Sequence, residues 1–448
     1  MKLWQKSTNV NERIDAFTVG RDRELDLELA PFDILGSLAH IRMLASVGLL
    51  EKEEERQLRA ALQRLYQNTT DGGFTIEPGM EDVHSQVEFM LTKELGDLGK
   101  KIHSGRSRND QVLVDLRLFF RHQLREVVSG MEALFAQLQT LSEEHKDVLL
   151  PGYTHLQVAM PSSFGLWFGA YAENLTDDLT QMLSTYQIIN QNPLGSAAGY
   201  GSSFPLDRKM TTRLLGFADL NYNVVHAQMG RGKTELFIGF ALAGLAQTLN
   251  KLATDMVLYL NQNFGFIRFP DELTTGSSIM PHKKNPDVFE LIRAKANQLL
   301  ALPAQIGTLT TNLPSGYHRD FQLLKEYLFP AFDQTQQCLE MMTFALQHIE
   351  VTPNILDDEK YQYLFSVEAV NKEVLNGTPF RDAYRLIGEQ IESGQFNPPK
   401  EVDHTHEGSI GNLCTREIRM KMDRILRQFD FGKVMEAERQ LLEKTADG

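Results

Sequence analysis

The sequence predicts an all-α fold built around an elongated bundle of long helices. The first observation is the stretch from Asn109 to Leu150, which contains no proline and only one glycine, Gly130. Its apolar residues recur at steps of three and four, the spacing that places them on one face of a helix. The second observation is that strand signals are weak along the whole chain. Helices much longer than the globular average can bury their apolar faces only against one another, which predicts a bundle.

Five long helices are predicted in chain order from their apolar periodicity. They are expected over residues 109–150, 161–190 and 232–263, then from 287 onward, and from 318 to 349. Pro161 suits the first turn of the second helix, because its missing N–H has no partner there in any case. Pro303 is expected to kink the fourth helix, and Pro330 to interrupt the fifth.

Shorter elements are expected on both sides of the bundle. Residues 33–47 and 52–66 have the apolar spacing of ordinary helices. Two segments, "GGFTIEP" at residues 72–78 and "FGFIRFP" at residues 264–270, are rich in strand-forming residues but short. At most, these two segments form a hairpin.

The length of 448 residues exceeds the size at which a single hydrophobic core usually stops growing, so more than one domain is expected. We predict an N-terminal helical domain over residues 1–105, the central long-helix domain over 106–350 and a small C-terminal domain over 351–448. The apolar faces of the long helices are wide for a single bundle. Burial between subunits of a homo-oligomer is therefore expected.

Composition narrows the classes of protein to which the chain can belong. Hydrophobic residues make up 42% and charged residues 23%, as in a globular protein. The net charge of −14 argues against nucleic acid or an anionic membrane as a partner. The two cysteines, Cys338 and Cys414, fit a reducing compartment, and neither a signal peptide nor an uninterrupted bilayer-spanning apolar run is evident. We expect a cytoplasmic protein.

Three polar connectors, each ahead of a predicted long helix, carry the residues suited to chemistry. They are "KKIHSGRSRNDQ" at residues 100–111, "LPGYTHLQ" at residues 150–157 and "TGSSIMPHKKNP" at residues 275–286. Loops on a rigid scaffold are where binding groups concentrate. The first connector gathers donors such as Arg108 and Asn109 before a helix N-terminus, which suits a carboxylate or a phosphate.

The other two connectors contain groups able to move a proton. His155 can exchange a proton near neutral pH. Ser277 could act as a base only if a nearby cation such as Lys283 and a helix N-terminus stabilised its alkoxide. Taken singly, these residues have a simpler interpretation, because serine and asparagine before a helix are most often caps and lysine is usually solvated.

Other motifs of known chemistry find little support. No serine lies on a Gly-x-Ser-x-Gly turn, and no glycine-rich phosphate loop precedes a helix in a βαβ unit. The segment "HTHEG" at residues 404–408 contains two histidines, but no further Cys/His cluster accompanies it. A structural role is therefore expected for His404, and we expect no metal site.

Together the connectors resemble a known family. "GSSIMPHKKNP" is similar to the long signature loop of the fumarase/aspartase superfamily. "HSGRSRNDQV" and "PGYTHLQ" resemble the argininosuccinate lyases within it, and "EDVHSQVE" at residues 81–88 matches the same family. The resemblance covers roughly residues 33–385. It implies an all-α, three-domain, fumarase/aspartase-like fold in a homotetramer, with each active site drawing its three loops from three subunits.

The activity implied by the resemblance is the reversible β-elimination of argininosuccinate to arginine and fumarate, in arginine biosynthesis, without a cofactor. Removing a proton next to a carboxylate creates a dianion that needs concentrated positive charge. By resemblance, Ser277 is the base, and Lys283 stabilises the intermediate. His155 supplies the proton to the departing guanidinium nitrogen, and Glu290 holds the charge of this histidine.

The resemblance also implies a set of substrate-binding residues, with argininosuccinate as the small-molecule partner: Arg108, Asn109, Thr154, Asn285, Tyr317, Gln322 and Lys325. Several positions depart from the family pattern, among them the opening "LWQKST" at residues 3–8 and the stretch "MGRG" at residues 229–232, which keeps only Arg231 of the usual motif. Asp22 stands where a substrate-binding serine is expected, and Leu323 and Leu324 replace an acidic pair. No match to the family can be placed after about residue 390. These departures affect the wall of the pocket and leave the groups that transfer protons intact.

Two alternatives stay open at this point. Another fumarate-releasing lyase of the superfamily, such as adenylosuccinate lyase or aspartase, shares the signature loop but usually lacks the other two connectors in this form. A non-catalytic, crystallin-like structural homologue is the second alternative. It would not need the complete set of Ser277, His155, Lys283 and Glu290 that this chain retains.

Overall fold

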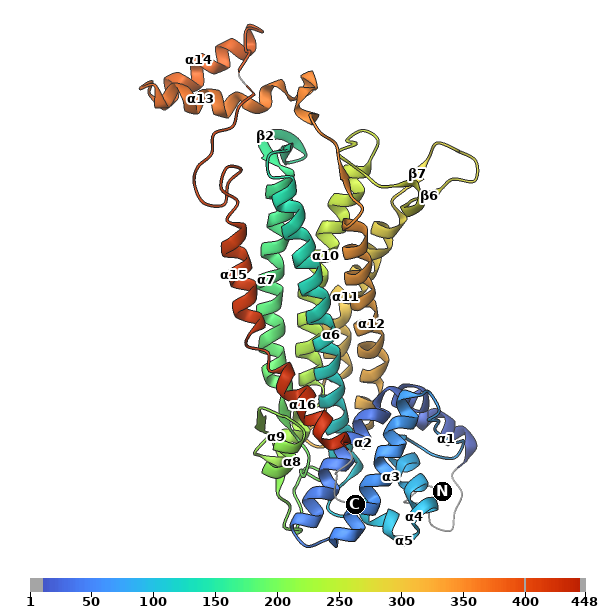
Figure 1. The fold of residues 1–448 in the computed structure, drawn as a ribbon. Coiled ribbons are helices and arrows are strands. Elements are labelled where there is room, and N and C mark those ends of the chain that lie inside the picture. Colours follow the sequence, from blue (N-terminus) through green and yellow to red (C-terminus); the bar gives the residue numbers. More distant parts are fainter. Residues whose placement is uncertain (1–10, 399, 444–448) are drawn as a thin grey trace.

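A computed structural model describes residues 11–398 and 400–443 and shows a mostly helical chain (Figure 1). Its centre is an elongated bundle of long helices: α6 (Arg108–Glu144), α7 (Phe164–Ile189), α10 (Lys233–Leu260), α11 (Asp287–Leu309) and α12 (Leu324–Leu346). The longest of them, α6, has 37 residues. At 1.5 Å per residue, it spans about 55 Å. The predicted bundle is confirmed.

The segment between the first two long helices corrects the prediction. It forms an antiparallel hairpin of β1 (Leu149–Thr154) and β2 (Gln157–Ser163). The first long helix ends at Glu144 instead of residue 150, and Pro161 lies in β2 instead of starting α7. Helix α7 starts one turn later, because the side chain of Ser163 caps it by accepting the backbone N–H of Leu166 at 3.0 Å.

The other short strands also differ from the prediction. The pairs are β3 (Gln191–Asn192) with β4 (Asp219–Leu220), β5 (Ile267–Arg268) with β8 (Glu350–Val351), and β6 (Thr275–Gly276) with β7 (Lys284–Asn285). The expected hairpin between residues 72–78 and 264–270 is wrong. The second of these segments pairs instead with the end of the bundle at Glu350, far along the chain.

The prolines inside α2, α11 and α12 do not end these helices. Helix α12 runs without interruption through Pro330, so the expected break there is wrong, and α11 continues through Pro303. Pro31 likewise lies inside α2, which begins at Asp22 instead of residue 33. In each case one face of the surrounding turns is buried, and tertiary packing of that face outweighs the loss of one backbone hydrogen bond.

Smaller helices cover the lower end of the bundle in Figure 1. They are α1 (Glu12–Val19), α2 (Asp22–Ser46), α3 (Lys52–Thr70), α4 (Val83–Leu95), α5 (Asp97–Lys100), α8 (Arg208–Leu214) and α9 (Val224–Met229). Helix α2 is buried along most of its length and packs on both α3 and α6. Its contact with α6 joins these helices to the bundle.

The C-terminal part of the chain has two regions. Helices α13 (Ser366–Leu375) and α14 (Phe380–Glu392) lie beyond the upper end of the bundle around a small core of their own. Helices α15 (Thr415–Leu426) and α16 (Phe431–Leu442) return along the bundle, where α15 contacts α7. The division at residues 105/106 and 350/351 stays a prediction.

Helix α10 lies in the main hydrophobic core, where Leu242, Leu245 and Leu249 are fully buried. By length and composition alone, it could also cross a membrane, with a mean hydropathy of 1.3 over its most apolar window. The sequence interpretation finds no such segment. Half of that window is buried within the chain against α7, α11 and α12, which is the environment of a core helix.

We predict that Leu245→Ala lowers the free energy of unfolding by about 2–5 kcal/mol, because it removes buried methyl groups and leaves a cavity. Urea denaturation followed by circular dichroism measures this change. Leu375→Ala is the matched control, since Leu375 is 87% exposed and its truncation creates no cavity. Equal losses for the two variants would contradict the placement of α10 in the core.

Candidate active site

The predicted site residues form two groups at opposite ends of the bundle (Figure 1). At the lower end, Arg108 and Asn109 begin α6, while Tyr317, Gln322 and Lys325 lie just before and within the first turn of α12. At the upper end are the residues of the hairpin, of the β6–β7 loop and of the first turn of α11, namely Thr154, His155, Ser277, Lys283, Asn285 and Glu290.

The lower group lines one pocket of about 270 Å³. Its walls are Asp22, Asp26, Glu81, Asp82, His84, Arg108, Asn109, Val112, Arg231, Tyr317, Arg319, Gln322 and Lys325. All the lower-group residues predicted from sequence are therefore brought together. The pocket is strongly polar, with carboxylates and cations on facing elements. Such a site suits a zwitterionic ligand better than an apolar one.

The residues around the first turn of α6 divide into those that cap the helix and those that line the pocket. Ser107 caps the helix by accepting the N–H of Asn109 at 3.3 Å, and Asp110 accepts the N–H of Ser107 at 2.8 Å. Arg106 is buried and donates to Ser37 and to the Ile102 carbonyl. Two other polar residues of this connector, Arg108 and Asn109, line the pocket. The capping interpretation holds for Ser107 and Asp110. Binding by Arg108 and Asn109 stays a prediction.

Arg108 is held in place by acidic residues that the sequence interpretation does not assign to the site. Its Nη1 lies 3.1 Å from Glu81 Oε2 and 3.2 Å from Asp82 Oδ2, and its Nη2 donates to Ser85 Oγ at 2.7 Å. Arg319 also pairs with Glu81, at 2.8 Å. Both acids belong to "EDVHSQVE", a motif that matches the family but receives no role from the sequence.

Two further predicted residues are anchored by the N-terminal helices. Gln322 donates its amide hydrogens to the carbonyls of Thr18 and Val19, at 3.1 and 2.9 Å. Lys325 Nζ lies 2.6 Å from Asp22 Oδ1 and 2.5 Å from Asp26 Oδ1. Although burial alone lowers the pKa of Lys325, the two carboxylates raise it above its usual value. Lys325 is therefore a permanent cation in the pocket wall.

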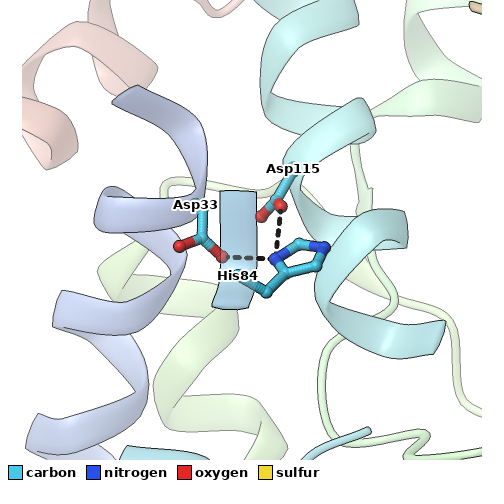
Figure 2. Close-up of side chains that lie close together, drawn as sticks. All are labelled: Asp33, His84 and Asp115. Atoms are coloured by element: carbon cyan, nitrogen blue, oxygen red, sulfur yellow. Dashed lines mark hydrogen bonds and ion pairs between the residues drawn. The ribbon is translucent and has the colours of Figure 1, made fainter. Parts of the chain in front are cut away.

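His84, in the wall of this pocket, belongs to a buried cluster with Asp33 and Asp115 (Figure 2). His84 Nδ1 lies 2.8 Å from Asp33 Oδ1 and 3.5 Å from Asp115 Oδ2. Burial alone lowers the pKa of His84, but the facing carboxylates outweigh it and raise the pKa to about 9. Burial, with the charge of Asp33, raises the pKa of Asp115 well above its usual range. The sequence interpretation misses all three residues.

The same cluster has the ligand atoms of a possible metal site, so a metal site and an ion pair have to be compared. Its ligand atoms lie within 4.8 Å of one another, the only such group among residues 11–398 and 400–443. With its raised pKa, the imidazole carries a proton on Nδ1 at neutral pH, and a metal would have to displace it. The 2.8 Å contact has the length of a charge-assisted hydrogen bond. We interpret the cluster as an ion pair.

At the upper end, the hairpin presents His155 to solvent. Its two-residue turn, His155 and Leu156, has positive φ angles of 54° and 57°, as a type I′ turn requires. The strand behind the turn is anchored by Tyr153, whose ring packs against Phe264 and Phe266 at centroid distances of 5.7 and 6.5 Å. The hairpin turn, although it contains no glycine, thus holds the imidazole of His155 out from a strand that Tyr153 anchors.

Ser277 lies on the loop between β6 and β7. Its Oγ accepts the backbone N–H groups of Met280 at 3.1 Å and Ile279 at 3.4 Å. Both donors would stabilise negative charge on this oxygen. Lys283, Asn285 and Glu290 line an open cleft of about 1220 Å³ beside this loop. This end of the chain therefore gathers a hydroxyl, a cation and a carboxylate.

The upper group remains incomplete in a single chain. Among the described residues, no hydrogen bond or ion pair joins His155 to Ser277 or to Glu290. The lower pocket lies at the other end of bundle helices about 35 to 55 Å long, so one chain does not bring both groups to one small molecule. The ring of His404, for which a structural role is expected, contacts Ser409 Oγ at 2.7 Å and Glu368 Oε1 at 3.1 Å.

Comparison with known proteins yields close relatives along the whole chain. The sequence pattern of a family described as "Lyase" matches residues 2–300. Argininosuccinate lyases of Parabacteroides distasonis and Bacteroides fragilis are each 61% identical, covering 98% of this chain and 99% of theirs. The argininosuccinate lyase of Thermotoga neapolitana is 39% identical over 87% of this chain and 98% of its own.

Solved structures share the fold at much lower identity. An EDDS lyase variant with bound fumarate superimposes with a TM-score of 0.76 at 21% identity, covering 97% of this chain and 95% of that one. The class II fumarase of Schistosoma mansoni superimposes with a TM-score of 0.72 at 15% identity, covering 99% of each chain. These likenesses show the fold alone.

We predict that the ion pair of His84 makes stability depend on pH. The pKa of His84 is about 9 in the folded chain, above its ordinary 6.5. The contribution of this ion pair to the free energy of unfolding is therefore complete below pH 6.5 and is lost as the pH rises through about 9. The loss amounts to up to about 3 kcal/mol. Urea denaturation at several pH values measures it. His84→Gln should flatten this dependence, and an equally steep dependence in the variant would contradict the assignment.

Proposed function

The chain belongs to the argininosuccinate lyase family of the fumarase/aspartase superfamily, and from this we propose that it cleaves argininosuccinate reversibly into arginine and fumarate. Relatives at 61% identity over nearly the whole chain support this activity over that of adenylosuccinate lyase or aspartase. The retained proton-transfer groups argue against a purely structural, crystallin-like role. In the cell, the reaction would supply arginine.

The structural observation that carries the mechanism is the hydroxyl of Ser277, which accepts two backbone N–H groups. As an alkoxide, Ser277 removes the proton from the carbon next to a succinyl carboxylate. The extra electron pair is held on that carboxylate as a dianion, which Lys283 and Asn285 stabilise. These two residues line the cleft beside the serine loop.

The second half of the reaction breaks the carbon–nitrogen bond. The electron pair of the dianion forms the double bond of fumarate, and the guanidinium nitrogen leaves with the electrons of the broken bond. His155 donates the proton that this nitrogen takes up, directly or through water, and Glu290 stabilises the charged imidazole beforehand. Ser277 takes up the proton from carbon, and His155 supplies the proton to the leaving nitrogen. The proposed chemistry therefore requires no cofactor.

The lower pocket supplies most of the binding groups. Arg108, Asn109 and Thr154 contact the carboxylates of the substrate, and Tyr317, Gln322 and Lys325 hold its remaining part, as the family membership suggests. Of these, only Thr154 lies at the upper end of the bundle, on the hairpin. The substrate therefore has to contact both groups at once, which a single chain does not allow.

We propose a homotetramer in which each site combines loops from three subunits. The separation of the two groups supports it, and so do exposed apolar side chains on the bundle helices, including Phe240 (47% exposed), Leu291 (62%) and Phe344 (43%). Cys338 and Cys414 are both free thiols. They fit the reducing cytoplasm, which is where we place the protein.

We predict that Ser277→Ala lowers turnover of argininosuccinate at least about a hundredfold, as expected for loss of a general base, without changing the helical content. Fumarate absorbance measures the rate, and circular dichroism checks the fold. Ser278→Ala is the matched control on the same loop and should cost far less. An unchanged rate in Ser277→Ala would remove this residue from the mechanism. Parallel assays with adenylosuccinate and aspartate test the substrate.

We further predict that mixing two inactive variants restores activity. Ser277→Ala changes the upper group and Asn109→Ala changes the lower group. If a site takes the two groups from different subunits, tetramers refolded from an equal mixture contain about a quarter intact sites. Fumarate release by the mixture, compared with each variant refolded separately, measures this recovery. A mixture no more active than its two components would mean that one chain supplies both groups.

A further inference from the structure

One wall of the lower pocket holds two carboxylates around a single ammonium group. Asp22 and Asp26 lie one turn apart on α2, and Lys325 Nζ lies 2.6 Å from the first and 2.5 Å from the second. The side chain of Lys325 is 5% exposed, so solvent contributes little to this arrangement. This wall therefore carries about one negative charge more than its own cation can balance.

The two carboxylates differ in what else they bind. Asp26 is 3% exposed and also accepts the backbone N–H of Val83 on its second oxygen, at 3.3 Å. The Asp22 side chain is 14% exposed and lines the pocket. Among the described residues, Lys325 is its only ion-pair partner. The second oxygen of Asp22 is thus the acceptor on this wall that a ligand can reach.

The other charges of the pocket are balanced among themselves. Their pairs are Arg108 with Glu81 and Asp82, Arg319 with Glu81, Arg231 with Glu235, and His84 with Asp33. The excess negative charge is therefore local to Asp22 and Asp26. Although Lys325 opposes it, burial raises the pKa of Asp22 to about 6, which leaves a charged carboxylate at pH 7.

We propose that Asp22 is a specificity residue that accepts the α-ammonium group of the substrate. Lys325, held between Asp22 and Asp26, then donates its third N–H to the α-carboxylate on the same carbon. Asp22 and Lys325 together bind the amino-acid end of the ligand as a zwitterion. The inference rests on the proposed function and adds the reason why one end of the substrate has to be an α-amino acid.

The position of Asp22 determines which kinetic constant it controls. It lies in the lower pocket, on an element other than the loops that carry Ser277 and His155, and it contacts the end of the substrate where no bond changes. An interaction of this kind contributes equally to the bound substrate and to the transition state. Its loss therefore raises KM and leaves kcat nearly unchanged.

The test compares two ligands in three proteins. The ligands are arginine and δ-guanidinovaleric acid, which is arginine without its α-ammonium group. Both are measured as inhibitors of fumarate release from argininosuccinate and as ligands by calorimetry. The proteins are the wild type, Asp22→Asn, which keeps the shape but loses the charge, and Glu24→Gln as the matched control. Glu24 lies on the same helix with its side chain 64% exposed, paired with Arg21.

The wild type should bind arginine about tenfold or more tightly than δ-guanidinovaleric acid, the usual worth of a charge-assisted hydrogen bond in a pocket. Asp22→Asn should reduce this preference to about twofold and raise KM for argininosuccinate about tenfold, with kcat within about threefold of wild type. Its affinity for δ-guanidinovaleric acid should be unchanged or tighter, since Lys325 loses a competing carboxylate. Glu24→Gln should match the wild type.

Three outcomes would overturn the proposal: an undiminished preference for arginine in Asp22→Asn, an equal loss of affinity for both ligands, or a fall in kcat alone. Asp22→Ser, which also removes the charge, repeats the test if Asp22→Asn melts at a lower temperature. A wild type that releases no fumarate would refute the proposed function. The calorimetric comparison of the two ligands would still decide the role of Asp22.

Discussion

The protonated imidazole of His84 is the interaction on which the rest of the lower site depends. It lies on α4, contacts Asp33 of α2 and faces Asp115 of α6, so one buried cation joins three helices (Figure 2). Removing one partner of such a buried pair leaves an uncompensated charge, at a cost of about 3–5 kcal/mol. The cluster thereby fixes the N-terminal helices against the first helix of the bundle, and this places Glu81 and Asp82 beside Arg108.

The same ion pairs that hold the helices together determine what the lower pocket can bind. Arg108 and Arg319 are positioned by acids from the segment just before α4, and Lys325 is positioned by acids from α2. Because each cation has a carboxylate partner, the pocket contains many charges without a large net charge. Ligand charges can then be matched one by one, which favours a substrate with both ammonium and carboxylate groups.

The length and stiffness of the bundle explain why the two groups of predicted site residues lie far apart within one chain. Packed helices about 35 to 55 Å long keep the upper loops away from the lower pocket. The His155–Leu156 turn instead projects outward in a left-handed conformation, which costs non-glycine residues of order 1 kcal/mol each. The aromatic anchor at Tyr153 holds the strand behind it. A histidine presented in this way is suited to act in a site completed by another chain.

The sequence alone determined the helical class, the approximate ends of the long helices and which connectors carry chemistry, because apolar periodicity and motif composition are local properties. It also indicated Arg108, Asn109 and Lys325 as pocket residues, through a family resemblance. Only the tertiary structure decided that Pro161 lies in a hairpin, that Pro330 does not break α12, and that the two groups of site residues lie at opposite ends. Packing between segments distant in sequence decides that α12 continues through Pro330 and that Asp33, His84 and Asp115 pair, and no local pattern reports either. The hairpin is local, but its turn contains no glycine and its second strand contains a proline, so the sequence carries only a weak strand signal there.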